Sequence, residues 1–197
     1  MLNQVHDIQQ VYRKVVDALS RPGRVQDLSD VAGKEERRKD IYPATLVLAR
    51  MLLDTEVTFK VFAENEEELT QLIRRLTYAK QAGASDADYI FIAHTALDDH
   101  LNEALHMAKI GDLDNPHQSA TLIVELPSVY GGEQRILKGP GIEHTAVCAA
   151  QAPAGWERVR EERNLEYPLG VDLIFTDAAQ LLLALPRTTR IEMEVQH

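Results

Sequence analysis

Residues 171 to 185 constrain the fold more than any other stretch of this chain. Val171–Thr176 is apolar and rich in β-branched and aromatic residues apart from Asp172, and Leu181–Leu185 is apolar on both faces. Short apolar runs of this kind are typical of strands that are buried on both sides. The polar stretch between them, Asp177–Gln180, suits a type I turn with aspartate at its first position. The pattern therefore predicts a buried hairpin.

The far end of this hairpin changes character abruptly. Pro186 ends the second strand because it has no N–H to donate, and the chain continues with Arg187, Thr188, Thr189 and Arg190. Arginine binds phosphate or carboxylate groups in a bidentate way, and threonine hydroxyls add donors. This end of the hairpin is therefore a candidate anion-binding site. The alternative is an ordinary ion pair with Asp172 or with a partner chain.

Asp172 interrupts an otherwise apolar strand. A buried carboxylate is costly unless it is paired or hydrogen-bonded. We therefore expect Asp172 to have a partner, either in the turn at Gly170 or in an arginine.

The rest of the chain alternates strands with helices and then favours strands, which is typical of the α/β class. Apolar spacing predicts helices over residues 4–19, 44–53, 66–80, 98–109 and 154–164. Further strands are predicted over residues 57–62, 88–93, 121–126, 134–138 and 191–195. The strands 121–126 and 134–138 are expected to pair as a hairpin through Pro127–Gly132. No repeat or linker composition divides the chain, so we expect one domain over residues 1–197, a single mixed sheet flanked by helices.

Proline and glycine residues mark the expected turns. Pro22 and Gly23 end the first helix. Gly111 is expected to cap the C-terminus of the helix over residues 98–109. Gly139 and Gly141 follow a predicted strand, but residue 144 is histidine where a dinucleotide fingerprint needs its third glycine. We interpret Gly139–Gly141 as a tight turn.

Composition narrows the class of protein. The net charge of −10 argues against nonspecific binding to nucleic acid or to an anionic membrane. No apolar run approaches the ~20 residues of a membrane span, and the N-terminus lacks the pattern of a signal peptide. The single cysteine excludes an internal disulfide. We therefore expect a soluble, cytoplasmic protein.

Residues that could carry chemistry do not form a recognisable catalytic or metal motif. His144 and Cys148 could meet if that stretch were helical, but the apolar neighbours of Cys148 favour a buried, inert thiol. The histidines lack the spacing of a zinc site, and Asp112–Asn115 lacks the glycine and glutamate of a calcium loop. Nothing distinguishes Lys138 from an ordinary surface lysine. The residues predict no metal and no cofactor.

Four marks in the chain resemble the PhnH family, the H subunit of the bacterial carbon–phosphorus lyase system. The first runs from Tyr12 and Arg13 to Leu19-Ser20 and Pro22-Gly23, and the second is Leu137-x-Gly-x-Gly-Ile142. The third is Tyr167–Thr176, and the fourth is Leu185-Pro-Arg-Thr-Thr189 before a β-rich tail. They occur in the family's order and bracket nearly the whole chain, whereas residues 63–120 match in pattern only.

The resemblance implies a homodimer whose fold is similar to the large domain of pyridoxal-phosphate (PLP) transferases but lacks the PLP site. It also implies partners, the G, I and J subunits of a core complex that joins ATP to a phosphonate and releases adenine. The H subunit is then an accessory rather than a catalytic subunit.

Two hypotheses remain for the residues that carry the resemblance. In the first, a cleft for ATP or a phosphonate is lined by Arg187, Thr188, Thr189, Arg190, Asp172 and Arg13, and the structural turns are Pro22, Gly23, Gly139, Gly141, Gly170 and Pro186. In the second, the protein is a structural dimer and docking protein that binds no small molecule. A free-standing PLP enzyme is a third, weaker alternative.

Overall fold

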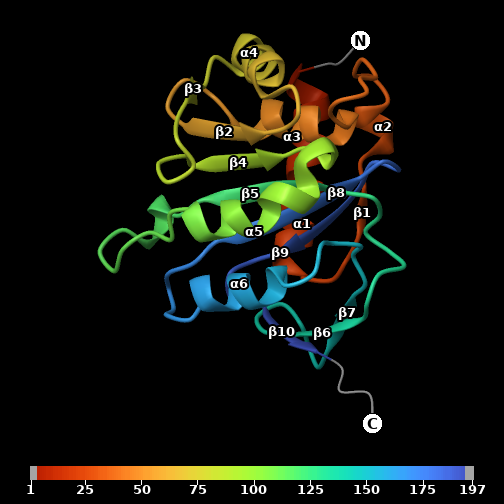
Figure 1. Ribbon diagram of the computed structural model, residues 1–197. Coiled ribbons are helices and arrows are strands. Elements are labelled where there is room, and N and C mark those ends of the chain that lie inside the picture. Colours follow the sequence, from red (N-terminus) through yellow and green to blue (C-terminus); the bar gives the residue numbers. More distant parts are fainter. Residues whose placement is uncertain (1–3, 194–197) are drawn as a thin grey trace.

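The computed structural model describes residues 4–193, and its centre is a seven-stranded sheet (Figure 1). The strands lie in the order β1-β9-β8-β5-β4-β2-β3. Neighbours from β8 to β3 are parallel, whereas β9 is antiparallel to both β8 and β1. The bounds are β1 Gln26–Asp27, β2 Thr58–Phe62, β3 Lys80–Gln81, β4 Tyr89–Ile92, β5 Thr121–Leu126, β8 Asp172–Asp177 and β9 Leu181–Leu185.

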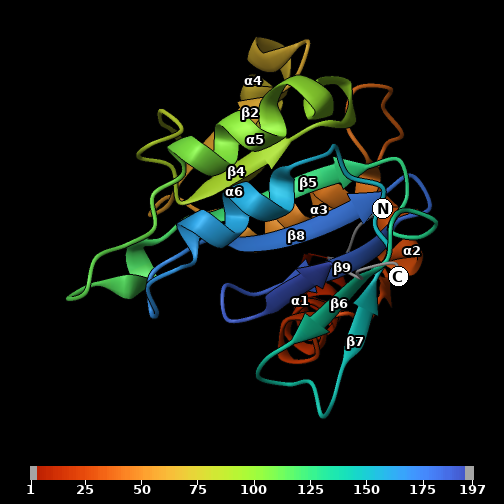
Figure 2. The same cartoon turned by 60° about the horizontal axis from the view of Figure 1, so that its bottom comes forward.

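Helices cover both faces of this sheet (Figure 2). A separate hydrophobic layer lies between each face and its helices. One layer receives side chains from α1 Gln4–Ser20, α2 Ser29–Ala32, α3 Pro43–Leu52 and α4 Glu66–Thr77. The other receives them from α5 Leu97–Met107 and α6 Trp156–Arg163. The predicted α/β class, with a mixed sheet flanked by helices, is confirmed. None of the helices in the described part of the chain has the length and apolar character that crossing a membrane requires.

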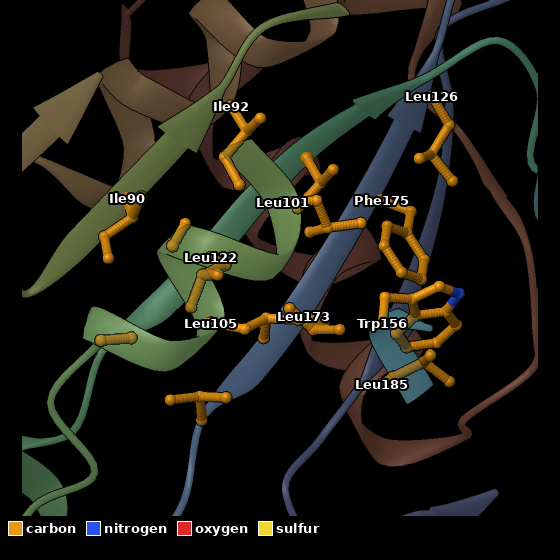
Figure 3. Close-up of a cluster of buried hydrophobic side chains, with 14 of the residues drawn as sticks. Ile90, Ile92, Leu101, Leu105, Leu122, Leu126, Trp156, Leu173, Phe175 and Leu185 are labelled. Carbon is orange, nitrogen blue, oxygen red and sulfur yellow. The ribbon is translucent and has the colours of Figure 1, made fainter. Parts of the chain in front are cut away.

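The predicted buried hairpin is confirmed and lies inside the sheet. β8 pairs with β5 over six positions and with β9 over four. Its side chains alternate between the layers, with Leu173 and Phe175 in one and Ile174 in the other, and none is more than 1% exposed. Trp156 of α6 meets the Phe175 ring edge-on, with ring centroids 5.3 Å apart (Figure 3). A strand that is covered on both faces and paired on both edges has to be apolar in its middle, and the polar residues of β8, Asp172, Thr176 and Asp177, lie at its two ends.

The turn of this hairpin is held by its first residue, as predicted. The backbone N–H of Gln180 donates to the carbonyl oxygen of Asp177 at 2.9 Å. The buried Asp177 carboxylate accepts the backbone N–H groups of Ala179, Leu181 and Val129. Gln180 adopts a left-handed φ of 65°, and its side chain accepts the N–H of Ala44 in the first turn of α3. A three-residue loop that ends in a left-handed residue is a common hairpin connection.

The predicted hairpin between residues 121–126 and 134–138 is wrong. Both edges of β5 are already occupied, by β4 and β8, so no third strand can pair with it. The chain instead leaves the main sheet and forms a second, three-stranded sheet in the order β10-β6-β7. Its bounds are β6 Arg135–Lys138, β7 Ala146–Cys148 and β10 Arg190–Met193. The prediction of a single sheet is therefore corrected to two.

The observed bounds of several other elements differ from the predicted ones. α4 stops at Thr77, and Lys80–Gln81 becomes an edge strand rather than the last turn of a helix. α5 ends at Met107 with Ala108 as its cap, so Gly111, with φ 79°, lies in the following turn and is not the cap. The strands β1 and β7 and the short helix α2 were not predicted, because segments of two to four residues show no periodicity. Residues 194–195 of the predicted last strand lie outside the described residues.

A fully buried carboxylate joins β5 to the two helices that start at the same end of the sheet. Glu125 accepts the backbone N–H of Tyr42, just before α3, at 2.6 Å and that of His94, after β4, at 3.1 Å. Its other contact is with His94 Nδ1 at 2.7 Å, and the His94 ring stacks on Tyr42. This hydrogen bond to Glu125 raises the pKa of His94 above 6.5; burial opposes it, while the Lys39 backbone and Asp40 assist.

This contact predicts a loss of stability in mildly alkaline solution. Because the folded-state pKa of His94 is raised, its contribution is complete below pH 6.5 and is lost as pH rises through the folded-state pKa. Chemical unfolding of the wild type across this window should show a fall in the free energy of unfolding that His94→Gln largely lacks. His106→Gln is the matched control, since it should keep the wild-type slope. Parallel slopes for wild type and His94→Gln would contradict the assignment.

Candidate anion-binding site

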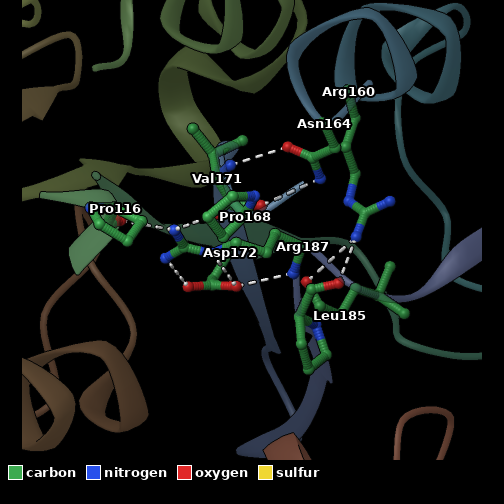
Figure 4. A network of polar contacts seen from close by, with 9 residues as sticks. Pro116, Arg160, Asn164, Pro168, Val171, Asp172, Leu185 and Arg187 are labelled. Carbon is green, nitrogen blue, oxygen red and sulfur yellow. Dashed lines mark hydrogen bonds and ion pairs between the residues drawn. The ribbon is translucent and has the colours of Figure 1, made fainter. Parts of the chain in front are cut away.

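The two ends of the β8–β9 hairpin meet in one ion pair. Asp172 begins β8, and Arg187 follows Pro186 directly after β9. The Asp172 carboxylate accepts the backbone N–H of Arg187 at 2.7 Å, Nη2 at 2.6 Å and Nε at 3.3 Å (Figure 4). The expectation that Asp172 has an arginine partner is confirmed.

Nη1 of Arg187 is also engaged by the chain itself, which leaves at most one N–H, on Nη2, without a partner. Nη1 donates to the carbonyl oxygen of Pro116 at 2.9 Å and reaches that of Pro168 at 3.5 Å. An arginine fork that binds a ligand needs at least two free parallel donors. Arg187 therefore acts mainly as a structural residue that ties β8, β9 and two loops together.

A second arginine, which the sequence did not single out, lies on the other side of this connection. Arg160 of α6 is only 3% exposed and donates to the carbonyl oxygens of Thr189 at 3.0 Å, Pro186 at 2.6 Å and Leu185 at 3.4 Å. Within residues 4–193 it has no carboxylate at ion-pair distance, and its Nε has no hydrogen-bond partner. Burial lowers its pKa to about 10, so the guanidinium is still charged at neutral pH.

The connection from Arg187 to Arg190 lies between two adjoining cavities. The first, of about 650 Å³, lies between α6 and β10 and is lined by Arg158, Arg160, Arg187, Thr189 and Arg190 among others. The second, of about 540 Å³, shares Arg187 and Arg190 and adds Thr188, Lys138 and Tyr167. Both volumes are in the range of small-molecule sites.

Charge favours an anion in the first cavity. Its walls include Glu157, Glu161 and Glu192. Glu157 and Glu192 are engaged by Arg135 and Lys138, which leaves the exposed Glu161 against Arg160 and Arg190. Arg190 is exposed and has no partner among the described residues, and the buried Thr189 hydroxyl is also unpaired. The hydrogen bonds of Arg160 go to carbonyl oxygens, and Asp172 acts on it only as a more distant negative charge, so an anion in this cavity would offset its charge further. Arginine and threonine bind and orient anions; they are poor acids and bases at neutral pH.

The structure brings most of the predicted site and turn residues together. A side chain at Gly139 would lie 2.8 Å from the carbonyl oxygen of Thr188, and one at Gly141 only 2.0 Å from that of Ser20. With positive φ at both glycines, the turn can press against the Ser20–Gly23 turn and the Thr188 backbone. Gly170 lies against Asn164, whose amide bonds the backbone of Val171. Apart from Tyr12 and Arg13 at the start of the first, the four marks of the resemblance therefore lie in adjoining parts of the molecule.

Arg13 is the exception. It lies on the exposed side of α1 and lines neither of the two cavities.

The residues that the sequence did not favour as catalytic groups lie where we expected them. Cys148 is buried in β7, where burial raises the pKa of its thiol, and Lys138 pairs with Glu192 at 2.7 Å. The stretch from His144 to Cys148 is not helical, so the condition for that pair is not met.

The Asp172–Arg187 pair predicts a large loss of stability when only one partner is removed. Asp172→Ala would leave the Arg187 guanidinium, 19% exposed, without its carboxylate, and we expect the free energy of unfolding to fall by about 2–3 kcal/mol, somewhat less than for a fully buried pair. Urea unfolding of the isolated chain measures this. The control is Glu162→Ala, which breaks the exposed Arg158–Glu162 pair and should cost less than about 1 kcal/mol. Equal effects for the two variants would rule out the structural role.

Comparisons with known proteins identify the family of this chain. HtxG of Stutzerimonas stutzeri, whose name describes it as a C-P lyase subunit protein, is 32% identical over 192 residues, 96% of this chain and 88% of HtxG. The protein named alpha-D-ribose 1-methylphosphonate 5-triphosphate synthase subunit PhnH from Rhizobium meliloti (strain 1021) is 27% identical over 195 residues, 96% of this chain and 92% of that protein. The model of the PhnH family matches residues 1–192. The chain belongs to the PhnH family of bacterial phosphonate metabolism proteins.

Proposed function

We propose that this chain is a subunit of a carbon–phosphorus lyase complex in phosphonate catabolism. In this role it supports the formation of alpha-D-ribose 1-methylphosphonate 5-triphosphate from ATP and methylphosphonate, with release of adenine. Family membership and the names of two relatives, each aligned over most of the chain, support this proposal. The chain acts there as a single cytoplasmic domain, and its fold is similar to that of the PLP transferase large domain without the cofactor.

The observation that carries a direct role for this subunit is the buried charge of Arg160. This guanidinium is 3% exposed, its hydrogen-bond acceptors among the described residues are all carbonyl oxygens, and it lies in the wall of a 650 Å³ cavity. Arg190 and the Thr189 hydroxyl lie in the same wall. We propose that this cavity holds an anionic group of ATP or of the phosphonate, with Arg187 as the residue that fixes the shape of the wall.

Assembly into a dimer and with the G, I and J subunits is part of the same proposal. α1 presents Tyr12 and Val16 to solvent, 61% and 42% exposed, and Val5 lies on the same helix at 71%. Apolar side chains gathered on one exposed helix mark an interaction surface. Arg13 is adjacent to Tyr12, so its place in the family mark suits an interface better than a cleft.

A second candidate function is a structural docking protein that binds no small molecule. It is favoured by Arg187, because four contacts within the chain already use the donors of its guanidinium. The two candidates differ in what Arg190 and Thr189 do, since neither residue makes a side-chain contact that the fold requires.

The decisive experiment is reconstitution of the complex. The G, I and J subunits are co-purified with and without this chain and assayed for adenine release from ATP and methylphosphonate. Arg190→Gln and Thr189→Val should assemble normally, because one side chain is exposed and the other change keeps its shape. We expect adenine release to fall about tenfold or more, the equivalent of one lost charge-assisted hydrogen bond.

Arg37→Gln is the matched control for charge, because Arg37 is an exposed arginine outside both cavities and outside the α1 surface. It should leave the rate of adenine release per assembled complex unchanged. Full activity in both cavity variants would support the docking function instead. Unchanged adenine release without this chain would refute any role in that step.

A further inference from the structure

A third hollow lies at the opposite edge of the main sheet from the cavities at α6 and β10. It has a volume of about 740 Å³ and is lined by residues from the last turns of α4 and from the edge strand β3. α4 and β3 lie together at one end of the molecule (Figure 1). The lining of the hollow comprises Gln71, Arg74, Arg75, Tyr78, Ala79, Lys80 and Gln81. The proposed role in phosphonate catabolism uses none of these residues.

The charge of this hollow is opposite to that of the protein. Three of its seven lining residues are cationic and none is acidic, although the whole chain carries 31 acidic against 21 basic residues. Arg74, Arg75 and Lys80 are exposed and have no ion-pair or hydrogen-bond partner for their side chains among residues 4–193. The carbonyl end of α4 favours cations nearby, but one turn of helix does not offset three positive charges. The hollow is therefore suited to a multiply charged anion.

An aromatic residue in a strained conformation lies beside these cations. Tyr78 caps α4 in the left-handed region, with φ 62° and ψ 10°, where glycine or asparagine is usual. Its side chain is 76% exposed and takes part in no ring contact within the described structure. Conformational strain at an exposed residue, with no packing to offset it, points to function. The ring is free to stack on a planar group.

We propose that this hollow binds a nucleoside polyphosphate, with the base stacked on Tyr78 and the phosphates held by Arg74, Arg75 and Lys80. Arginine and lysine side chains that line the same hollow can bind phosphate groups through charge-assisted hydrogen bonds. A base gains from stacking on an exposed aromatic ring whatever its identity. The amides of Gln71 and Gln81 can bond the base edge or the ribose. The volume of the hollow is in the range of small-molecule sites.

The test uses the isolated full-length chain and calorimetric titration with ATP, inorganic triphosphate and adenosine. We expect ATP to bind more tightly than triphosphate, and adenosine to bind weakly. Arg74→Gln combined with Arg75→Gln should weaken ATP binding about tenfold or more. Tyr78→Asn should weaken ATP binding severalfold and leave triphosphate binding unchanged, because only the stacked base is lost. Tyr130→Asn and Arg13→Gln are the matched controls and should bind ATP as the wild type does.

Thermal unfolding separates this result from damage to the fold. Asparagine tolerates the left-handed conformation better than tyrosine does, so Tyr78→Asn should have the same melting temperature as the wild type or a higher one.

Absence of ATP binding would overturn the proposal. So would equal binding of triphosphate and ATP with no dependence on Tyr78, which indicates a general polyanion patch. Loss of ATP binding when the other subunits are added, with the reciprocal weakening of assembly by ATP, would mark the hollow as a docking surface for an acidic partner instead. Arg190→Gln should leave this binding unchanged, so failure here and failure of the proposed function are distinguishable.

Discussion

The complete burial of β8 is the constraint on which the rest of the structure depends. β8 is paired on both edges, and its side chains enter both hydrophobic layers. A strand in this position cannot expose a polar group along its length, so polar residues are confined to its ends. Asp172 stands at one end and Asp177 at the other, and each carboxylate accepts three hydrogen bonds, from Arg187 in one case and from Val129, Ala179 and Leu181 in the other. The strand is apolar in its middle and organises its surroundings through its ends.

The candidate site follows from this arrangement. Because β9 returns antiparallel to β8, Arg187 emerges next to Asp172, and their ion pair fixes the start of the connection to β10. That connection crosses from the main sheet to the second sheet, and α6 packs over it with Arg160. A segment that joins two sheets leaves space at its sides, and the two cavities lie there. The positive charge of Arg160 then makes one of them a place for an anion.

Several features could be predicted from the sequence because they depend on local pattern. The Val171–Leu185 hairpin, its aspartate-led turn and the five main helices each carry a periodicity or a turn residue that reports which side of an element is buried. Pairing between distant strands carries no such local mark. The predicted hairpin after β5 was wrong because both edges of β5 are paired, with β4 and with β8, and the local sequence does not show this pairing. The same limit hid Arg160, which is an ordinary charged residue in a polar helix until β9 and β10 pack beneath it.

The sequence by itself determined that this is an α/β chain with a buried hairpin, and that arginine, threonine and aspartate gather at the ends of that hairpin. Only the tertiary structure decided which of them are available to a ligand. The guanidinium of Arg187 donates to Asp172, Pro116 and Pro168. The guanidinium of Arg190 is exposed and unpaired among the described residues, and Arg160 of α6 contributes a buried positive charge. The physical reason is that a side chain's hydrogen bonds depend on groups that are close in space. Pro116 and Arg187 are 71 residues apart in the chain, and no local pattern could have joined them.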